Sequence, residues 1–196
     1  MLLDSSATPR PQGGDMVIAR LNARAQPLDR LEVFEHPLDQ VLQATGTGMV
    51  TGGGTMLGDE GEIAFCDLEL SVPKASDAVL GTIRKALEGV GAPKGSKLIW
   101  NDGANELDLG VAEGLAVYLN GTDLPDEVYE QSDVNVVYEE LDRLVASEGR
   151  VVSHWEGPRE TALYLYGRCA DSMLAKIRPF LETYPLCDKA RTAKIA

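Results

Sequence analysis

DAVLGTIRKALEGV, residues 77–90, recurs as DSMLAKIRPFLETY, residues 171–184, with a constant offset and no gap. Both copies place their apolar residues three or four positions apart, which is the spacing of one face of an α-helix. The shared stretch therefore predicts an amphipathic helix that the chain uses twice. The matching positions are Asp77, Leu80, Ile83, Arg84, Leu87 and Glu88 in the first copy and Asp171, Leu174, Ile177, Arg178, Leu181 and Glu182 in the second.

Two further matches lie upstream of these helices. EVFE at 32–35 recurs as EVYE at 127–130. Before them, Leu21-Asn22 followed by Pro27 recurs as Leu119-Asn120 followed by Pro125. Because the three matches keep the same order in both halves, we interpret the chain as an internal duplication.

Each half shows the same order of predicted elements, in which short apolar runs indicate strands and longer periodic runs indicate helices. In the first half these are a strand at 16–22, a helix at 36–45, strands at 48–57 and 62–72, a helix at 77–90 and a strand at 97–100. In the second half they are a strand at 114–120, a helix at 133–147, strands at 150–156 and 161–167, a helix at 171–184 and a strand at 192–196. We expect Ser76 and Asp133 to cap the helices that follow them.

The order βαββαβ is that of the ferredoxin-like fold. Right-handed crossovers place both helices on one face of a four-stranded antiparallel sheet. The fold class is therefore α+β, with two tandem ferredoxin-like repeats. Over nearly all of residues 16–196 the chain resembles α/β-plait proteins in which a fused pair mimics a dimer. The resemblance is one of topology and identifies no named family.

The predicted domains are a disordered lead at 1–15, a first repeat at 16–100, a linker at 101–110 and a second repeat at 111–196. The linker is rich in Gly, Asn and Asp, which mark turns and loops. Met16 begins the first strand-like run, so translation could start at either Met1 or Met16, and the sequence leaves both alternatives open.

Composition narrows the classes of function. The chain has 196 residues and a formal net charge of −13, which disfavours nucleic-acid binding and suits a basic protein partner. Its three cysteines show no metal-binding or C-x-x-C spacing and indicate a reducing compartment. No apolar run approaches the ~20 residues of a membrane helix. We therefore expect a cytoplasmic protein that does not enter a membrane.

VTGGGTMLGDEGE, residues 50–62, looks like a phosphate loop, but it has no Lys and leads into a strand rather than a helix. Glycine within a strand more often marks a close approach by a bulky group. The counterpart of residues 51–54 in the second half is Val152-Ser153-His154-Trp155. We therefore expect Gly52, Gly53 and Gly54 to receive an aromatic side chain, either Trp155 or a residue of a partner.

The hairpin SHWEGPRETALYLY, residues 153–166, gathers His154, Trp155, Tyr164 and Tyr166. A histidine beside these groups could transfer protons. However, strand alternation places His154 on the opposite sheet face from Trp155, and no residue is in place to orient it. His36 lies in a different context and no third ligand is visible, so we predict no metal site, no cofactor and no catalytic residue.

The strand at 62–72 separates polar and apolar side chains. Asp67 and Glu69 fall on one face, and Cys66, Leu68 and Leu70 fall on the other. We interpret the carboxylate face as solvated or as a contact between subunits. Cys66 is interpreted as a small core residue.

The favoured function is a binding or interaction protein, because a duplicated plait without catalytic machinery leaves sheet faces to be covered. We expect those faces to be buried against each other, against a second copy in a homodimer, against a protein partner or over a ligand. The alternative is a small-molecule sensor or enzyme whose cleft lies between the two repeats. That cleft would be lined by His154, Trp155, Tyr164, Tyr166 and residues 52–54.

Overall fold

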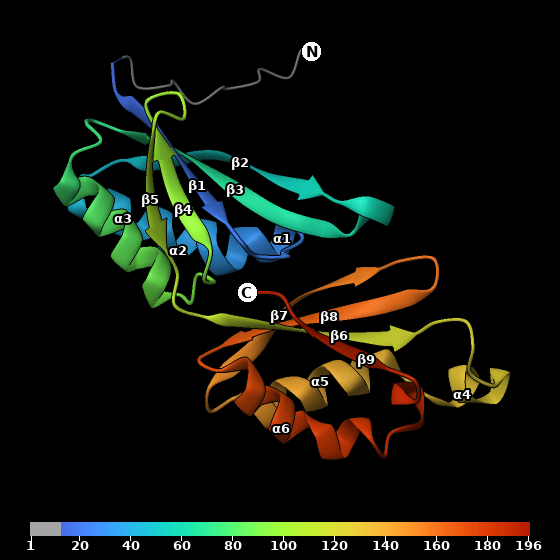
Figure 1. Cartoon of the computed structure of the whole chain (residues 1–196). Helices are drawn as coiled ribbons and strands as arrows, with labels where there is room; N and C mark the ends of the chain where they lie inside the picture. Colours follow the sequence, from blue (N-terminus) through green and yellow to red (C-terminus); the bar gives the residue numbers. More distant parts are fainter. Residues whose placement is uncertain (1–12) are drawn as a thin grey trace, which may run out of the picture.

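A computed structural model describes residues 13–196 and contains two antiparallel sheets (Figure 1). Most of the predicted lead therefore lies outside the described residues. The first sheet contains β1 (Asp15–Leu21), β2 (Met49–Leu57), β3 (Ile63–Val72), β4 (Ser96–Trp100) and β5 (Asn105–Leu109), in the order β2-β3-β1-β4-β5. The second contains β6 (Glu113–Asn120), β7 (Gly149–Glu156), β8 (Glu160–Gly167) and β9 (Arg191–Lys194), in the order β7-β8-β6-β9.

The helices alternate with these strands as the duplication predicts. In the first half they are α1 (Pro27–Arg30), the π-helical turn η1 (Leu31–Glu35), α2 (His36–Thr45) and α3 (Asp77–Gly89), with a 3-10 turn η2 (Asp59–Gly61). In the second half they are α4 (Asp126–Gln131), α5 (Val134–Val145) and α6 (Ala170–Leu181), with a 3-10 turn η3 (Pro185–Cys187). Both halves follow the βαββαβ order, so the predicted fold class is confirmed.

The helices form where periodicity and capping favour them. In α5 the side chain of Asp133 accepts a hydrogen bond of 2.8 Å from the backbone N–H of Asn135, which is the predicted N-cap. Its apolar stripe buries Val137, Leu141 and Val145. At the start of α3, Ser76 has the extended backbone of an N-cap, but its side chain makes no capping hydrogen bond, so that part of the prediction was wrong.

The first sheet has one strand more than predicted. Residues 105–109, expected to be linker, form β5 and pair antiparallel with β4, with Asn105 opposite Trp100. The turn between the two strands places Asn101, Asp102 and Gly103 at positive φ. Asn, Asp and Gly tolerate positive φ best, so the sequence pattern predicts the turn correctly. The same residues gave no indication of the short strand that follows.

The repeated EV(F/Y)E segments adopt related but unequal structures. In the first half, residues 31–35 form the π-helical turn that joins α1 to α2 in one continuous helical run. In the second half, residues 127–130 lie within α4, which ends before Ser132 and Asp133. The duplication thus preserves helical character here, while the cap at Asp133 divides the second copy in two.

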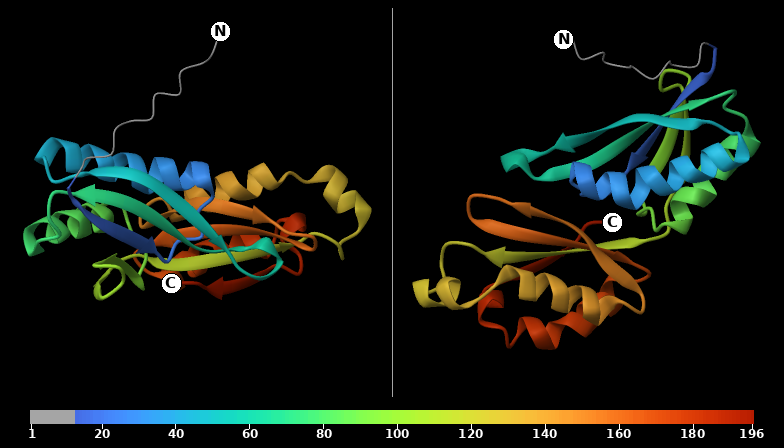
Figure 2. Two further views of the ribbon diagram at one scale, coloured as in Figure 1. Left: turned by 90° about the horizontal axis from the view of Figure 1, so that it is seen from above. Right: turned by 180° about the vertical axis from the view of Figure 1, so that it is seen from behind.

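The two halves stack as four layers. Helices α1 to α3 cover one face of the first sheet and also lie against the second sheet, whose far face carries α5 and α6 (Figures 1 and 2). One continuous core joins the first sheet and its helices to Val152, Tyr118, Tyr164 and Tyr166 of the second sheet. The second sheet is therefore covered on both faces, whereas residues 13–196 cover only one face of the first sheet.

Candidate functional site

The two halves meet around a single carboxylate. Glu62, which precedes β3, accepts hydrogen bonds of 2.7 Å from Tyr118 and 2.8 Å from Tyr164 and forms an ion pair with Arg24. The Tyr166 hydroxyl accepts a hydrogen bond of 2.8 Å from the backbone N–H of Arg24. All three tyrosines are buried. We call these five residues the seam cluster.

The electrostatics of the seam cluster favour one protonation state. Burial raises the pKa of Glu62, but the bonds from Tyr118, Tyr164 and Arg24 outweigh it and hold that pKa below its ordinary value. Burial, followed by the bond to Glu62, raises the pKa of Tyr164. Because the carboxylate already has three donors and the tyrosines keep their protons, the cluster joins the halves and offers no free acid or base.

A second set of bonds ties α1 to the strand β7. The Ser153 hydroxyl donates to Asp29 at 2.5 Å and accepts from the backbone N–H of Gln26 at 3.0 Å. The Gln26 side chain donates to the His154 carbonyl at 2.8 Å. Ser153 is buried and hydrogen-bonded to a carboxylate directly, without an intervening histidine, so it is not arranged as an activated nucleophile.

His154 lies on the other side of β7, opposite Leu163 of the α5 and α6 core. It lines a cavity of about 350 Å³ with Asp29, Tyr138 and Glu156. The predicted separation of His154 from Trp155 across the sheet is consistent with this arrangement, since Trp155 packs on the core shared by the two halves.

The three glycines of β2 do not share one environment. A side chain at Gly53 would meet the carbonyl of Asp67 and the ion pair that Arg30 and Glu35 form at 2.5 Å. No atom lies within 4 Å of a Cβ at Gly54, and a Cβ at Gly52 would meet only Glu69.

The expected seating of Trp155 on the glycine strip is therefore wrong. A Cβ at Gly157, in the hairpin of Trp155 itself, would overlap the indole ring. Gly53 instead leaves room for the nearly buried ion pair of Arg30 and Glu35, because any side chain at this position would collide with it. The sequence pattern identified the need for space at Gly53 but not the group that fills it.

The open face of the first sheet mixes apolar and charged side chains. Ile18 of β1 stands opposite Ile99 of β4, and the two are half-buried. Arg20 lies over the ring of Phe65 at 4.4 Å and forms an ion pair with Asp67 at 2.9 Å. The predicted assignment of Asp67 to the face opposite Cys66 agrees with the burial of the Cys66 side chain.

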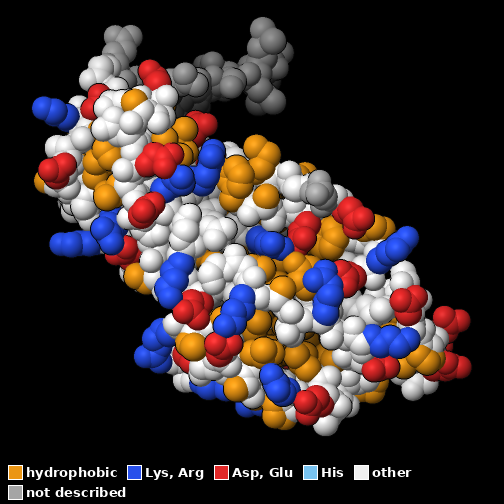
Figure 3. All heavy atoms as spheres, in the orientation of Figure 1, with side chains coloured by type: hydrophobic (Ala, Val, Ile, Leu, Met, Phe, Trp, Pro, Cys, Tyr) orange, Lys and Arg blue, Asp and Glu red, His pale blue; other side chains and the backbone are white. Residues whose placement is uncertain are grey.

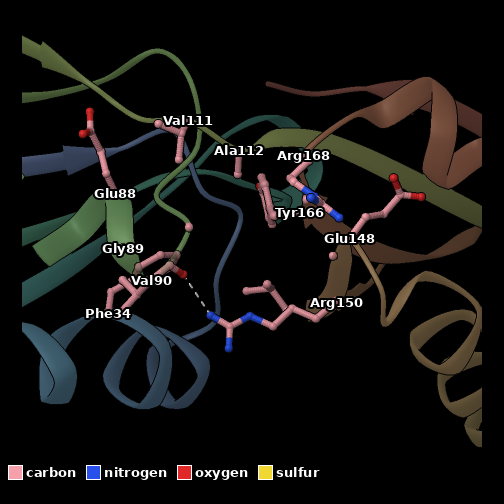
Figure 4. A pocket seen from close by; sticks show the side chains of 14 residues that line it. Phe34, Glu88, Gly89, Val90, Val111, Ala112, Glu148, Arg150, Tyr166 and Arg168 are labelled. Atoms are coloured by element: carbon pink, nitrogen blue, oxygen red, sulfur yellow. Dashed lines mark hydrogen bonds between the residues drawn. The ribbon is translucent and has the colours of Figure 1, made fainter. Parts of the chain in front are cut away.

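A cleft of about 400 Å³ opens where α3 approaches the ends of β7 and β8 (Figure 4). Figure 4 shows Arg150 reaching across the cleft to the Val90 carbonyl, while Tyr166 and Arg168 line it from the second half. Of the residues singled out from the sequence, this cleft contains Tyr166; Gly52 and Gly54 lie at the open sheet and His154 at the smaller cavity.

Arg24 and Glu62 were missed by sequence reasoning. Arg24 lies between Ala23 and Ala25, which are both fully buried. This alternation of small apolar and polar residues is the signal that could have predicted a packed extended segment. Glu62 carries no such signal, because it is the first residue of the predicted strand at 62–72 and its partners are remote in sequence.

Among residues 13–196, no group of three or more His, Cys, Asp or Glu side chains could hold a metal ion. No helix in that range is long and apolar enough to cross a membrane. On the face shown in Figure 3, Lys and Arg side chains alternate with Asp and Glu and form no continuous basic stripe.

No protein-family model matches the chain, and no curated protein matches its sequence. Among solved structures, it is similar to the regulatory subunit of aspartate kinase from Thermus flavus, with 15% identity, a TM-score of 0.29, and coverage of 86% of this chain and 93% of that chain. A putative monooxygenase from Fusobacterium nucleatum gives 11% identity, a TM-score of 0.32 and coverage of 93% and 92%. The first two RRM domains of the yeast poly(U) binding protein give 10% identity, a TM-score of 0.25 and coverage of 93% and 99%. At these values the similarities assign neither a family nor a function to this chain.

Proposed function

We propose that this chain is a non-enzymatic interaction protein that binds a basic protein partner on the open face of its first sheet. The main support for the proposal is that the faces opposite the helices, which are equivalent in the two sheets, are covered to different extents. The second sheet buries the face opposite its helices against the first half through Tyr118, Tyr164 and Tyr166, whereas the described residues leave the same face of the first sheet uncovered. A half-covered sheet must either solvate or bury its other face.

The apolar part of the open face is suited to a protein contact. The pair Ile18 and Ile99 lies near its centre, with Phe65 on the neighbouring strand. Met16 is 52% exposed at one end of β1. Beside them, Gly52 and Gly54 leave the β2 backbone uncovered, so a partner can approach closely.

The charges of this face favour a basic partner over a second copy. Arg20 and Lys97 are paired with Asp67 and Glu106 at 2.9 and 2.8 Å. On the same face, Glu69 and Asp108 form no ion pair with the side chains that the structure describes. Two copies would bring like charges together, whereas a basic surface would be attracted to them.

We also propose that the protein is cytoplasmic. The support for this location is that Cys66, Cys169 and Cys187 are free thiols and form no disulfide with one another. Free thiols persist where the compartment is reducing.

The test begins with a photo-crosslinking amino acid at position 18, on the open face, and the same residue at position 85, an exposed position on α3, as the control. In cells, position 18 should crosslink to one protein whose contact surface is basic, and position 85 should not. Crosslinking of position 18 to a second copy of this chain, or to an acidic surface, would overturn the proposal.

Binding of the purified partner then measures the contribution of the face. Ile99→Lys should weaken binding tenfold or more, because it places a cation at the apolar centre of a contact with a basic surface. Val136→Lys, on an exposed position of α5, is the matched control and should leave affinity unchanged. Equal affinity for the wild type and Ile99→Lys would contradict the proposed surface.

A further inference from the structure

The cleft between α3 and the ends of β7 and β8 is distinct from the open sheet face. We propose that it binds a small organic monocarboxylate with an apolar body. The inference does not depend on the proposed function, because the cleft lies at the seam between the halves. Its lining comes from the C-terminal end of α3, the segment before β6, the start of β7 and the end of β8.

The size and walls of the cleft suit a small molecule. Its volume of about 400 Å³ falls within the range of roughly 300–1,000 Å³ that ligand pockets occupy. Phe34, Ala112, Val152 and Tyr166 line it with side chains that are buried in the core. An apolar ligand body would therefore contact a preformed apolar wall.

The polar groups at the opening are two guanidinium groups. Arg150 donates to the Val90 carbonyl at 3.1 Å and Arg168 donates to the Ser147 carbonyl at 2.8 Å (Figure 4 shows the Arg150 bond). Both side chains are exposed, and neither forms an ion pair with a carboxylate that the structure describes. A guanidinium has five N–H donors, so each arginine retains donors for a ligand carboxylate.

The two glutamates of the cleft are already neutralised. Glu88 pairs with Arg84 at 2.9 Å, and Glu148 pairs with Lys176 at 2.9 Å. Glu148 also accepts a hydrogen bond of 2.9 Å from Ser172. Both carboxylates therefore have a cationic partner of their own, and the charge of Arg168 also contributes to lowering the pKa of Glu148.

The remaining charge selects a monoanion. Each arginine lies at the C-terminal end of a helix, since Val90 follows α3 and Ser147 follows α5. A helix C-terminus is equivalent to roughly half a negative charge, so the two ends leave about one positive charge at the opening. That charge matches one carboxylate, repels a cation, and is too small for a phosphate dianion in a chain of net charge −13.

The first experiment compares four probes on the intact chain: phenylacetate, phenethylamine, benzyl alcohol and inorganic phosphate. Titrations followed by backbone amide NMR should show saturable shifts at residues 89–91 and 149–150 with phenylacetate. The amine, the alcohol and phosphate should bind at least tenfold more weakly. Equal binding of phenylacetate and the alcohol would overturn the role of the arginines, and stronger binding of phosphate would overturn the choice of a carboxylate.

Arginine variants then locate the site. Arg150→Gln and Arg168→Gln should each weaken phenylacetate binding about tenfold, whereas Arg159→Gln, in the β7–β8 turn, makes the same change of charge away from the cleft. Equal weakening by all three variants would show a general charge effect and would contradict the site.

A pair of glycine variants tests whether a side chain that enters the cleft blocks binding. Neither Gly81 nor Gly89 of α3 has an atom within 4 Å of an added Cβ, and only Gly89 lines the cleft. Gly89→Glu should abolish phenylacetate binding, and Gly81→Glu should preserve it, while both variants stay folded because glycine is replaced by a better helix former. Undiminished binding by Gly89→Glu would overturn the proposal.

Discussion

Tyr164 of the second half donates a hydrogen bond of 2.8 Å to the carboxylate of Glu62 of the first half, 102 positions away in the chain. Tyr164 is completely buried and Glu62 is three-quarters buried at its side chain. With Tyr118 and Arg24 completing the carboxylate's partners, this contact fixes the first half on the inner face of the second sheet.

Tyr164→Phe should lower the free energy of unfolding by about 1.5–3 kcal/mol, the range for a hydrogen bond to a charged group. Urea denaturation measures the change. Tyr184→Phe is the control, because among the described residues its hydroxyl bonds only to the Asp133 backbone, at 3.2 and 3.3 Å, near the surface. Equal losses in both variants would show that the Glu62 contact has no special weight.

Glu62 should make the free energy of unfolding depend on pH in the acidic range. Its pKa is held below the ordinary value of 4.5 in the folded chain, so its contribution is present above that pH and is lost as the pH falls through the folded pKa. The stability difference between the wild type and Glu62→Gln should therefore shrink between pH 7 and pH 3. Unfolding curves across that range test it, and a constant difference would contradict the sign of the shift.

Gly53→Val should destabilise the fold by about 1–3 kcal/mol, because the new side chain would displace the Arg30–Glu35 pair. Gly54→Val, one residue away and facing open space, should change stability by less than about 0.5 kcal/mol. The comparison uses denaturant midpoints. If the two variants had the same midpoint, the close approach at Gly53 would not be the reason for that glycine.

The cysteines should react unequally with Ellman's reagent. Burial raises the pKa of Cys66 to about 12 and that of Cys187 to about 11, so both remain protonated thiols at pH 8. Cys169 is only half-buried and should be labelled first. Mass mapping of singly labelled protein identifies the site, and first labelling at Cys66 would show that its strand opens readily.

The candidate sites were only partly predictable from local patterns. Alternation correctly placed Asp67 opposite Cys66, since adjacent strand positions face opposite ways. Arg150 and Arg168 gave no signal, because each acquires its position only when β7 and β8 meet the end of α3. Of the two donors expected for the glycine strip, Trp155 was wrong, because the pseudo-symmetry of the sequence does not specify how the halves dock, and a residue of a partner stays a prediction.

Helix periodicity, strand alternation and the repeat shared by α3 and α6 are local features, so they predict two βαββαβ halves without any knowledge of how the halves pack. Which sheet face is covered depends instead on contacts between the halves. Either sheet could leave the face opposite its own helices free for a partner. The second sheet covers this face because Glu62 and Arg24 of the first half bond to its Tyr118 and Tyr164. Burying those hydroxyls is costly unless they are hydrogen-bonded, and the partners that satisfy them are far apart in the sequence.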